Sequence, residues 1–223
     1  MIAASIEKVA GASTGERLIA CVAEQGSASH PYVGSAELLI APCSTRNLAD
    51  AVHFLCTIHG RYPGILDHAA TRSTEGPVHA WLVEAREGFS AERTFLARLT
   101  VEAGPVPRTP GAAGAEATLV AQRRALALLA QSERLGCALG AAMALVADWS
   151  AVRPVLDTAA RRFGMSVPAH GLIGKDSVGA LADALGTEPL VERALLFGAQ
   201  QIMLQHRGLW DLLEARQLAR EAR

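Results

Sequence analysis

The feature that most constrains the fold is an apolar run of thirteen residues, LGCALGAAMALVA at 135–147. Arg134 and Asp148 bound this run, which is shorter than the roughly 20 residues that a helix needs to cross a bilayer. The run therefore predicts a buried helix inside a globular fold. Gly136 and Gly140 lie four residues apart within it, and this spacing favours the close approach of a neighbouring helix.

The composition favours helices throughout the chain. Half of the 223 residues are hydrophobic but only 4% are aromatic, so the core must be built largely from Ala, Leu and Val. These residues are typical of packed helices, whereas sheets favour β-branched and aromatic side chains. No run shows the strict alternation expected of a strand. We therefore predict an all-α multi-helix bundle, with about eight to ten helices, forming a single domain over residues 1–223.

One stretch interrupts the helical pattern. Residues 104–114, GPVPRTPGAAG, are the only Pro/Gly-rich segment of the chain. Such a segment indicates either a surface loop or a linker between two parts. The prediction is a loop that joins two helical halves of one domain.

Charge and cysteine usage limit the partners and the compartment. The net charge of −1 provides no electrostatic footprint for nucleic acid and no attraction to an anionic membrane, so neither partner is expected. The four cysteines are scattered without CxxC pairing, which indicates reduced thiols. The first residues do not resemble a signal peptide. These features together predict a cytoplasmic protein.

The basic side chains are almost all arginine, since only Lys8 and Lys175 are lysines. Arginine is suited to bidentate contacts with anions, but a GC-rich genome would produce the same bias. The adjacent pair Arg123 and Arg124 is interpreted as part of a solvated helix face.

The segment DAVHFLCTIHGRYPGILDH, residues 50–68, holds the densest group of ligand-type side chains. Asp50, His53, Cys56 and His59 are spaced by three, and each step of three residues turns back by about 60° around a helix. One straight helix therefore cannot present all four to one ion, although a pair could bind a metal with a distant donor. The metal-ligand candidates are His53, His59, Glu75 and His79.

Two residues of this segment are the candidates for catalysis. His59 is the candidate acid, base or ligand, because an imidazole titrates near neutral pH. Tyr62, beside Pro63, could direct its hydroxyl inward or serve only in packing. His206 follows Ile202 and Met203 on an apolar face, so it is either a hydrogen-bonded core residue or a group that binds a haem or lines a cavity. The candidate cofactor-binding residues are His53, His79 and His206. The sequence leaves open whether His53 or His59 points inward, and toward which of His79 and His206.

Several motifs, taken in order, resemble the haem-oxygenase-like helical superfamily, which includes TenA-type thiaminases, PqqC-type oxidases and iron-containing redox enzymes. The motifs are SHPYV at 29–33, the histidine-bearing segment 53–70, a helix ending FLARLTVEAG, a small-residue helix ending RRFG, and a loop with His170 and Asp176. The resemblance spans about residues 29–215. It implies a haem-oxygenase-like bundle, with a ferritin-like or other up-down bundle as the alternative.

The di-iron ligand pattern of that superfamily is not retained. Val146 stands where a glutamate is expected in the small-residue helix. With Asp176 taken as the aspartate of the His-x-x-x-Asp-x-x-His pattern, Leu172 and Gly179 stand where the histidines belong. The resemblance therefore implies either iron at other residues or no cofactor, as in the cofactor-free oxidation of PqqC-type proteins.

These observations lead to two hypotheses about function. The first is a protein that binds or oxidises a small organic molecule or cofactor in a central cavity between helices, where bundles usually place their pockets. The second is a catalytically inactive binding or dimerisation module, suggested by the missing ligands. The amphipathic C-terminal segment WDLLEARQLAREAR is the reason for expecting a homodimer.

Overall fold

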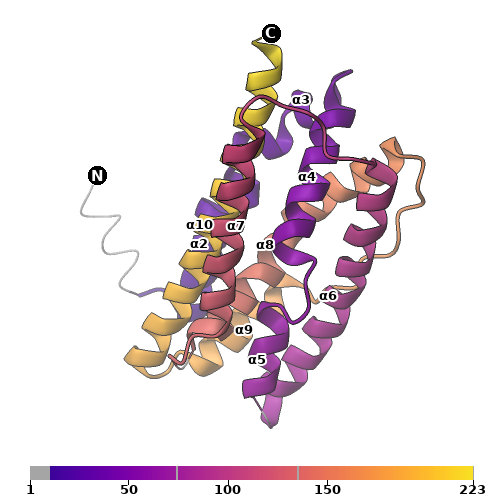
Figure 1. The fold of residues 1–223 in the computed structure, drawn as a ribbon. Coiled ribbons are helices and arrows are strands. Elements are labelled where there is room, and N and C mark those ends of the chain that lie inside the picture. Colours follow the sequence, from indigo (N-terminus) through magenta and orange to yellow (C-terminus); the bar gives the residue numbers. More distant parts are fainter. Residues whose placement is uncertain (1–10, 74, 135, 223) are drawn as a thin grey trace.

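The structure is a computed structural model that describes residues 11–73, 75–134 and 136–222. Within these ranges all regular elements are helical, comprising nine α-helices and two short 3-10 helices (Figure 1). The predicted all-α class and the predicted number of helices are therefore confirmed for this part of the chain.

The helices follow one another with mostly short connections. Their bounds are α2 Thr14–Gln25, α3 Ala36–Leu39, α4 Ser44–His59, α5 Ile65–Arg72, α6 Gly76–Ala103, α7 Ala112–Ala130, α8 Cys137–Arg162, α9 Lys175–Leu185 and α10 Pro189–Glu221. The 3-10 helices η1 (Ser27–Ser29) and η2 (Pro31–Gly34) connect α2 to α3. In Figure 1, α5 continues below α4 after the turn that contains Pro63.

From Cys137 on, the apolar run forms the first part of the central helix α8, which packs against α2, α4, α5, α6, α7, α9 and α10. By length and composition α8 could span a bilayer, but 78% of its most apolar 18-residue window is buried by the rest of the chain. The prediction of a buried helix is thus confirmed, and α8 contributes more residues to the hydrophobic core than any other described helix.

Glycines set the separation between α8 and α10. A Cβ atom at Gly140 would lie 2.0 Å from the carbonyl oxygen of Leu195, and one at Gly198 would lie 1.9 Å from the carbonyl oxygen of Cys137. No side chain fits at such distances, so the two backbones can meet only because these positions are glycine. The close helix approach predicted from Gly136 and Gly140 is confirmed.

The loop between the two helical halves is shorter than predicted. Gly104 ends α6 with a φ of 70°, and α7 already begins at Ala112, so the loop covers 104–111 instead of 104–114. Ala112 and Ala113 are strong helix formers, which explains why the helix starts earlier than the glycines suggest. Helices on both sides of the loop share one hydrophobic core, because α7 and α10 pack against α4.

A buried carboxylate on α4 holds this loop in place. Asp50 accepts hydrogen bonds from Arg216 (Nη2 at 2.9 Å) and Arg220 (Nη1 at 2.5 Å) of α10. Arg216 also donates to the carbonyl oxygen of Pro107 at 3.1 Å, and Arg220 donates to Thr109 Oγ1 at 2.8 Å. The loop is therefore tied to the same side chains that join α4 to α10.

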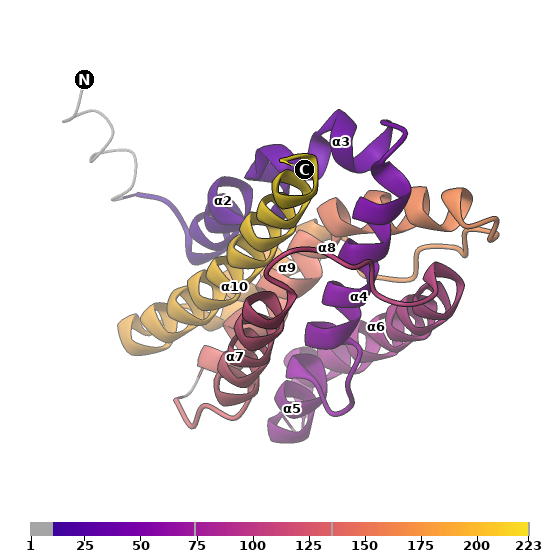
Figure 2. The same ribbon diagram turned by 45° about the horizontal axis from the view of Figure 1, so that its top comes forward.

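The amphipathic C-terminal segment packs within its own chain. Figures 1 and 2 both show α10 running beside α7, with its C-terminal end near α3. Trp210 and Leu213, on the apolar face of this segment, are buried. The face that suggested a homodimer is thus covered by other helices of the chain, and the homodimer stays a prediction.

Candidate functional site

His59 and His206 meet in the interior of the bundle. Leu48, Val52, Leu55 and His59 recur at helical spacing on α4, which places the His59 ring on the buried face of its last turn. His206 occupies the buried face of α10. The two Nε2 atoms lie 2.9 Å apart. Of the pairings that the sequence left open, the structure therefore brings together His59 and His206.

Asp148 lies directly behind His206. The Asp148 Oδ2 atom is 2.6 Å from His206 Nδ1, and each side chain is only 1% exposed. Asp148 also accepts hydrogen bonds from the Ser27 backbone N–H (2.7 Å) and hydroxyl (2.5 Å). Trp210 Nε1 donates in turn to Ser27 Oγ at 2.8 Å. We call His59, His206 and Asp148 the buried triad.

Ser27 can reach Asp148 because the residue before it has no side chain. A Cβ atom at Gly26 would lie 2.3 Å from Asp148 Oδ1, closer than any real Cβ contact. Gly26 ends α2, so this contact joins the end of α2 to the middle of α8.

One arrangement of protons satisfies the hydrogen bonds of the buried triad when both imidazoles are neutral. A carboxylate only accepts, so His206 Nδ1 donates to Asp148. When both imidazoles are neutral, His206 Nε2 is bare and His59 Nε2 donates to it. His59 Nδ1 keeps its lone pair and makes no hydrogen bond to any residue that the structure describes. One basic nitrogen therefore remains available on His59.

A pocket of about 380 Å³ opens beside His59, within the size range of small-molecule sites. It lies between the end of α4, the following turn, the start of α5, and α7, with one residue each from α6 and α8. Its apolar lining consists of Ile58, Pro63, Ile65, Phe89, Leu126, Ala127, Ala130 and Leu145.

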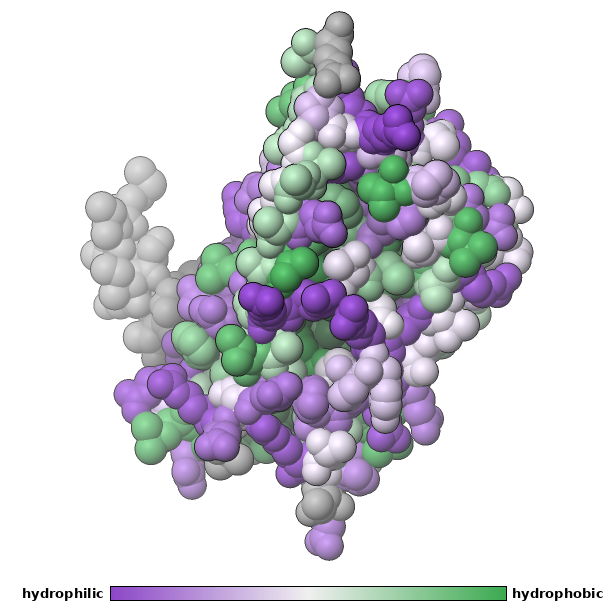
Figure 3. All heavy atoms as spheres, in the orientation of Figure 1, coloured by the Kyte–Doolittle hydropathy of each residue, from purple (hydrophilic) through white to green (hydrophobic). Residues whose placement is uncertain are grey.

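The charged lining of this pocket is basic. It comprises Arg61, Arg123 and Arg124, the imidazoles of His59 and His68 lie beside them, and no acidic residue is present among the described residues that line the pocket. Figure 3 shows hydrophilic side chains gathered across the middle of this face, over α7 and the hollow beside it. The pair Arg123 and Arg124, interpreted from the sequence as part of a solvated face, therefore borders a cavity.

His59 is held as a neutral imidazole by its surroundings. Burial lowers the pKa of His59 well below its ordinary value of 6.5, and the adjacent His206 ring lowers this pKa further. Two aromatic rings meet His59 edge-on, Trp149 at 5.5 Å and Phe89 at 6.2 Å between ring centroids. A neutral imidazole with a free lone pair is the form that accepts a proton.

A second buried network of hydrogen bonds, centred on Glu92, holds the Trp149 ring that packs against His59. Trp149 Nε1 donates to Glu92 Oε2 at 3.0 Å, and Arg153 Nη1 donates to Glu92 Oε1 at 2.5 Å. His170 Nδ1 lies 3.4 Å from the same Glu92 oxygen. This network joins α6, α8 and the loop after α8, and it fixes the orientation of the Trp149 ring against His59.

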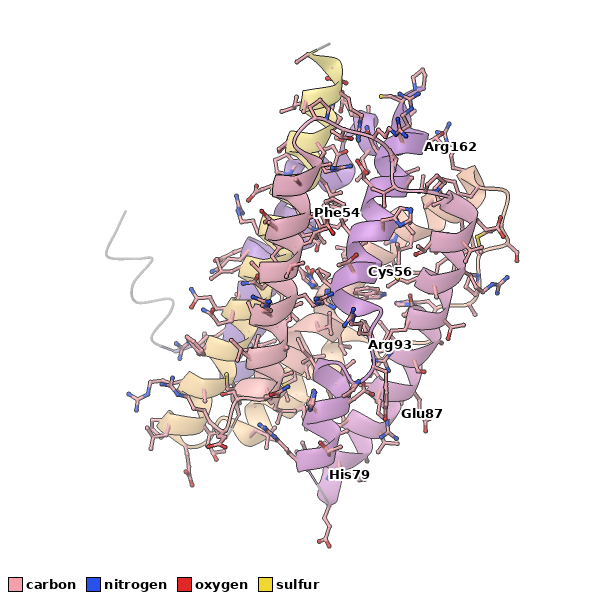
Figure 4. All side chains as sticks on the ribbon, in the orientation of Figure 1. Phe54, Cys56, His79, Glu87, Arg93 and Arg162 are labelled. Carbon is pink, nitrogen blue, oxygen red and sulfur yellow. The ribbon has the colours of Figure 1, made fainter. Side chains whose placement is uncertain are left out.

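Tyr62, the second predicted catalytic residue, lies at the mouth of the pocket. Its side chain is 76% exposed, and the Arg93 guanidinium stacks over its ring at 5.7 Å. Arg93 reaches this turn from α6 (Figure 4) and pairs with Asp67 of α5 at 2.7 Å. The Tyr62 hydroxyl is therefore not directed into the protein beside His59.

The other predicted site histidines lie elsewhere. His53 Nε2 is 2.8 Å from the carbonyl oxygen of Gly104 and thereby holds the start of the 104–111 loop. His79 hydrogen-bonds the carbonyl oxygen of Ser73. In Figure 4, His79 lies at the lower end of the molecule, far from the middle of α4. Neither residue joins the buried triad.

The residues present do not fit an iron site. Within the described ranges, no group of three or more His, Cys, Asp and Glu side chains is arranged to hold a metal ion. The predicted set of His53, His59, Glu75 and His79 is therefore not brought together. His206 uses both ring nitrogens in hydrogen bonds, which leaves no lone pair for a haem iron. Val146, at the expected glutamate position, is buried in the apolar core.

Sequence reasoning missed Asp148 and its partner Ser27. A signal for Asp148 was present, because this carboxylate directly follows thirteen apolar residues on the same helix. A carboxylate in a buried helix must find a hydrogen-bonding or charged partner. No comparable signal marks Ser27, which is one of several serines in a polar connection.

A model described as a family of unknown function (DUF6975) matches residues 22–221. The chain belongs to this family. The DUF6975 match includes every residue of the buried triad, the serine behind it and all residues that line the pocket. Comparisons with curated proteins and with solved structures gave no match.

Proposed function

We propose that this chain binds a small organic molecule in the pocket beside His59, and that His59 acts on it as a general acid and base. The observation that carries this proposal is the buried triad, in which a neutral histidine at the pocket is backed by a second histidine and a carboxylate. Such arrangements orient the base and stabilise the charge that forms on it.

The triad can move a proton away from the pocket in two steps. His59 Nδ1 accepts a proton from the bound molecule, and His59 Nε2 passes its own proton across 2.9 Å to His206 Nε2. His206 then carries the positive charge 2.6 Å from the Asp148 carboxylate. The charge thus ends beside an opposite charge instead of in the apolar wall of the pocket, which favours the transfer.

We also propose that the helices form a haem-oxygenase-like bundle, because the all-α architecture is compatible with the order of motifs in the chain. The proposal also includes oxidation of the bound molecule as one outcome, in which dissolved molecular oxygen would accept the two electrons that the deprotonated molecule gives up. Many oxidations of organic molecules begin with the loss of a proton, and His59 is placed to accept one.

The proposed role of His59 as a base can be tested with 5-nitrobenzisoxazole. This uncharged molecule opens to a coloured cyanophenolate when one C–H proton is removed. We expect wild-type protein to accelerate this reaction over buffer and His59→Gln to lower the rate by at least about tenfold. His68→Gln is the matched control, because His68 lines the same pocket outside the triad.

Asp148→Asn tests the rest of the triad. The variant removes the negative charge that stabilises protonated His206, so we expect a lower rate and an altered pH profile with His59 still present. Equal rates for wild-type protein and His59→Gln would contradict the proposal. The chain would then be an inactive binding module, the alternative that the missing family ligands suggest.

A further inference from the structure

We infer that the molecule bound beside His59 is an organic anion, whose carboxylate or phosphate group is held by Arg61, Arg123 and Arg124. This inference rests on the proposed function only for the position of the reactive end of the ligand, next to His59. The rest of the argument comes from the charge, the pairing and the chemistry of the pocket lining.

The three arginines carry charge that the protein does not neutralise. None of them forms an ion pair or a side-chain hydrogen bond with a residue that the structure describes. By contrast, Arg93 nearby is paired with Asp67 at 2.7 Å, and Arg153 is paired with Glu92 at 2.5 Å. The pocket therefore brings together three arginines without an anionic partner among the described residues; Arg123 is half-buried, whereas Arg61 and Arg124 are exposed.

These arginines come from two separate elements. Arg123, which is half-buried, and Arg124 are neighbours on α7, whereas Arg61 lies in the turn after α4. All three line one pocket. Guanidinium groups from two elements can grip an oxyanion in the bidentate manner that arginine favours over lysine. The net charge of the chain is −1, so this excess of positive charge is local.

The remaining lining specifies the other part of the ligand. Ile58, Phe89 and Leu145 provide apolar surface in the pocket that the arginines and His59 also line. A purely polar anion would leave this surface without a partner, and an uncharged ligand would leave the three cations without one. A carboxylate or phosphate attached to an apolar body, such as an aromatic ring, satisfies both parts of the lining.

Three probes separate the charge of the ligand from its apolar body: benzoate, phenyl phosphate and benzyl alcohol. We expect at least one of the two anions to bind wild-type protein about tenfold or more tightly than benzyl alcohol at low salt, measured as Kd by titration calorimetry. The two anions also distinguish a carboxylate site from a phosphate site.

The matched variants are Arg123→Gln/Arg124→Gln and Arg98→Gln/Arg161→Gln. Both remove two positive charges, but Arg98 and Arg161 are exposed residues outside the pocket. The pocket variant should weaken binding of the anion by about tenfold or more and leave benzyl alcohol unaffected, whereas the control variant should change each Kd by less than about twofold.

Either of two results would overturn the inference: benzyl alcohol binding as tightly as both anions, or equal weakening of anion binding in the two double variants. Failure of the proposed general-base role can be told apart from failure of anion binding, because 5-nitrobenzisoxazole carries no charge and its reaction depends on His59. If anions bind through the arginines but His59→Gln has no effect on the rate, only the general-base role fails.

Discussion

Burial decides the charge state of His59 before any ligand arrives. The folded protein lowers the pKa of His59 below the value of 6.5 that it has when exposed. Between these two values the unfolded chain binds a proton at His59 that the folded chain does not bind. The contribution of His59 to the free energy of unfolding therefore increases with pH over this range. Above about pH 6.5 this contribution is constant.

This linkage predicts the pH dependence of stability. Below about pH 6.5 the free energy of unfolding should fall by up to about 1.4 kcal/mol per pH unit through His59 alone. His59→Gln should remove this part of the slope, since an amide does not titrate, whereas His68→Gln should retain it. Urea unfolding between pH 5 and 8 measures the effect. Identical slopes for His59→Gln and wild-type protein would show that His59 is protonated as readily when folded as when unfolded.

At the level of helices, the contact between α8 and α10 holds the triad together, because Asp148 lies on one helix and His206 on the other. Gly140 and Gly198 allow the two backbones to touch. Any separation of these helices would lengthen the hydrogen bond between the carboxylate and the imidazole. Close packing of small residues is thus a condition for the site as well as for the core.

Adding one methyl group to this contact should therefore be costly. Gly198→Ala would place a Cβ atom 1.9 Å from the carbonyl oxygen of Cys137, and we expect a loss of at least about 2 kcal/mol in the free energy of unfolding. Gly114→Ala is the control, because Gly114 lies in α7 with no atom near its missing Cβ. That variant should gain up to about 1 kcal/mol from helix propensity. Denaturant titration measures the free energy of unfolding of both variants. Equal stability of Gly198→Ala and Gly114→Ala would contradict the close contact.

The same helices show how far the sequence alone can lead. The apolar run at 135–147 specified a buried helix and its glycine contact, because both follow from local spacing. The pairing of His59 with His206 joins residues 147 positions apart, and no local pattern determines which helices become neighbours. That the solvated Arg123 and Arg124 also border a cavity could not be predicted for the same reason, since the cavity exists only once α7 has packed beside α4 and α5.

At the scale of the whole molecule, the 104–111 loop connects two halves that do not form separate cores. Helices from both sides of the loop contribute to one hydrophobic cluster, and Asp50 on α4 binds Arg216 on α10. The covalent connection through the loop therefore contributes little to holding the halves together once the chain has folded.

Cutting the loop tests this view. A protease site inserted between Pro110 and Gly111 should allow cleavage of the folded protein without dissociation, so the nicked chain should elute on size exclusion like the intact 23.4 kDa chain. The two fragments should separate only under denaturing conditions. Two independently eluting fragments would indicate two domains and contradict the shared core.

The absence of a side chain at Gly26 has a consequence for the whole family. Any larger residue there would occupy the space of the Asp148 carboxylate, so a relative that carries Asp148 and His206 for the same purpose must also keep glycine at position 26. A combined signature of Gly26-Ser27, His59, Asp148 and His206 would sort family members by genome sequence alone. Members that lose one part of this signature are expected to lose the general-base chemistry that we propose, because the proton then has no path from His59 to a side chain paired with a carboxylate.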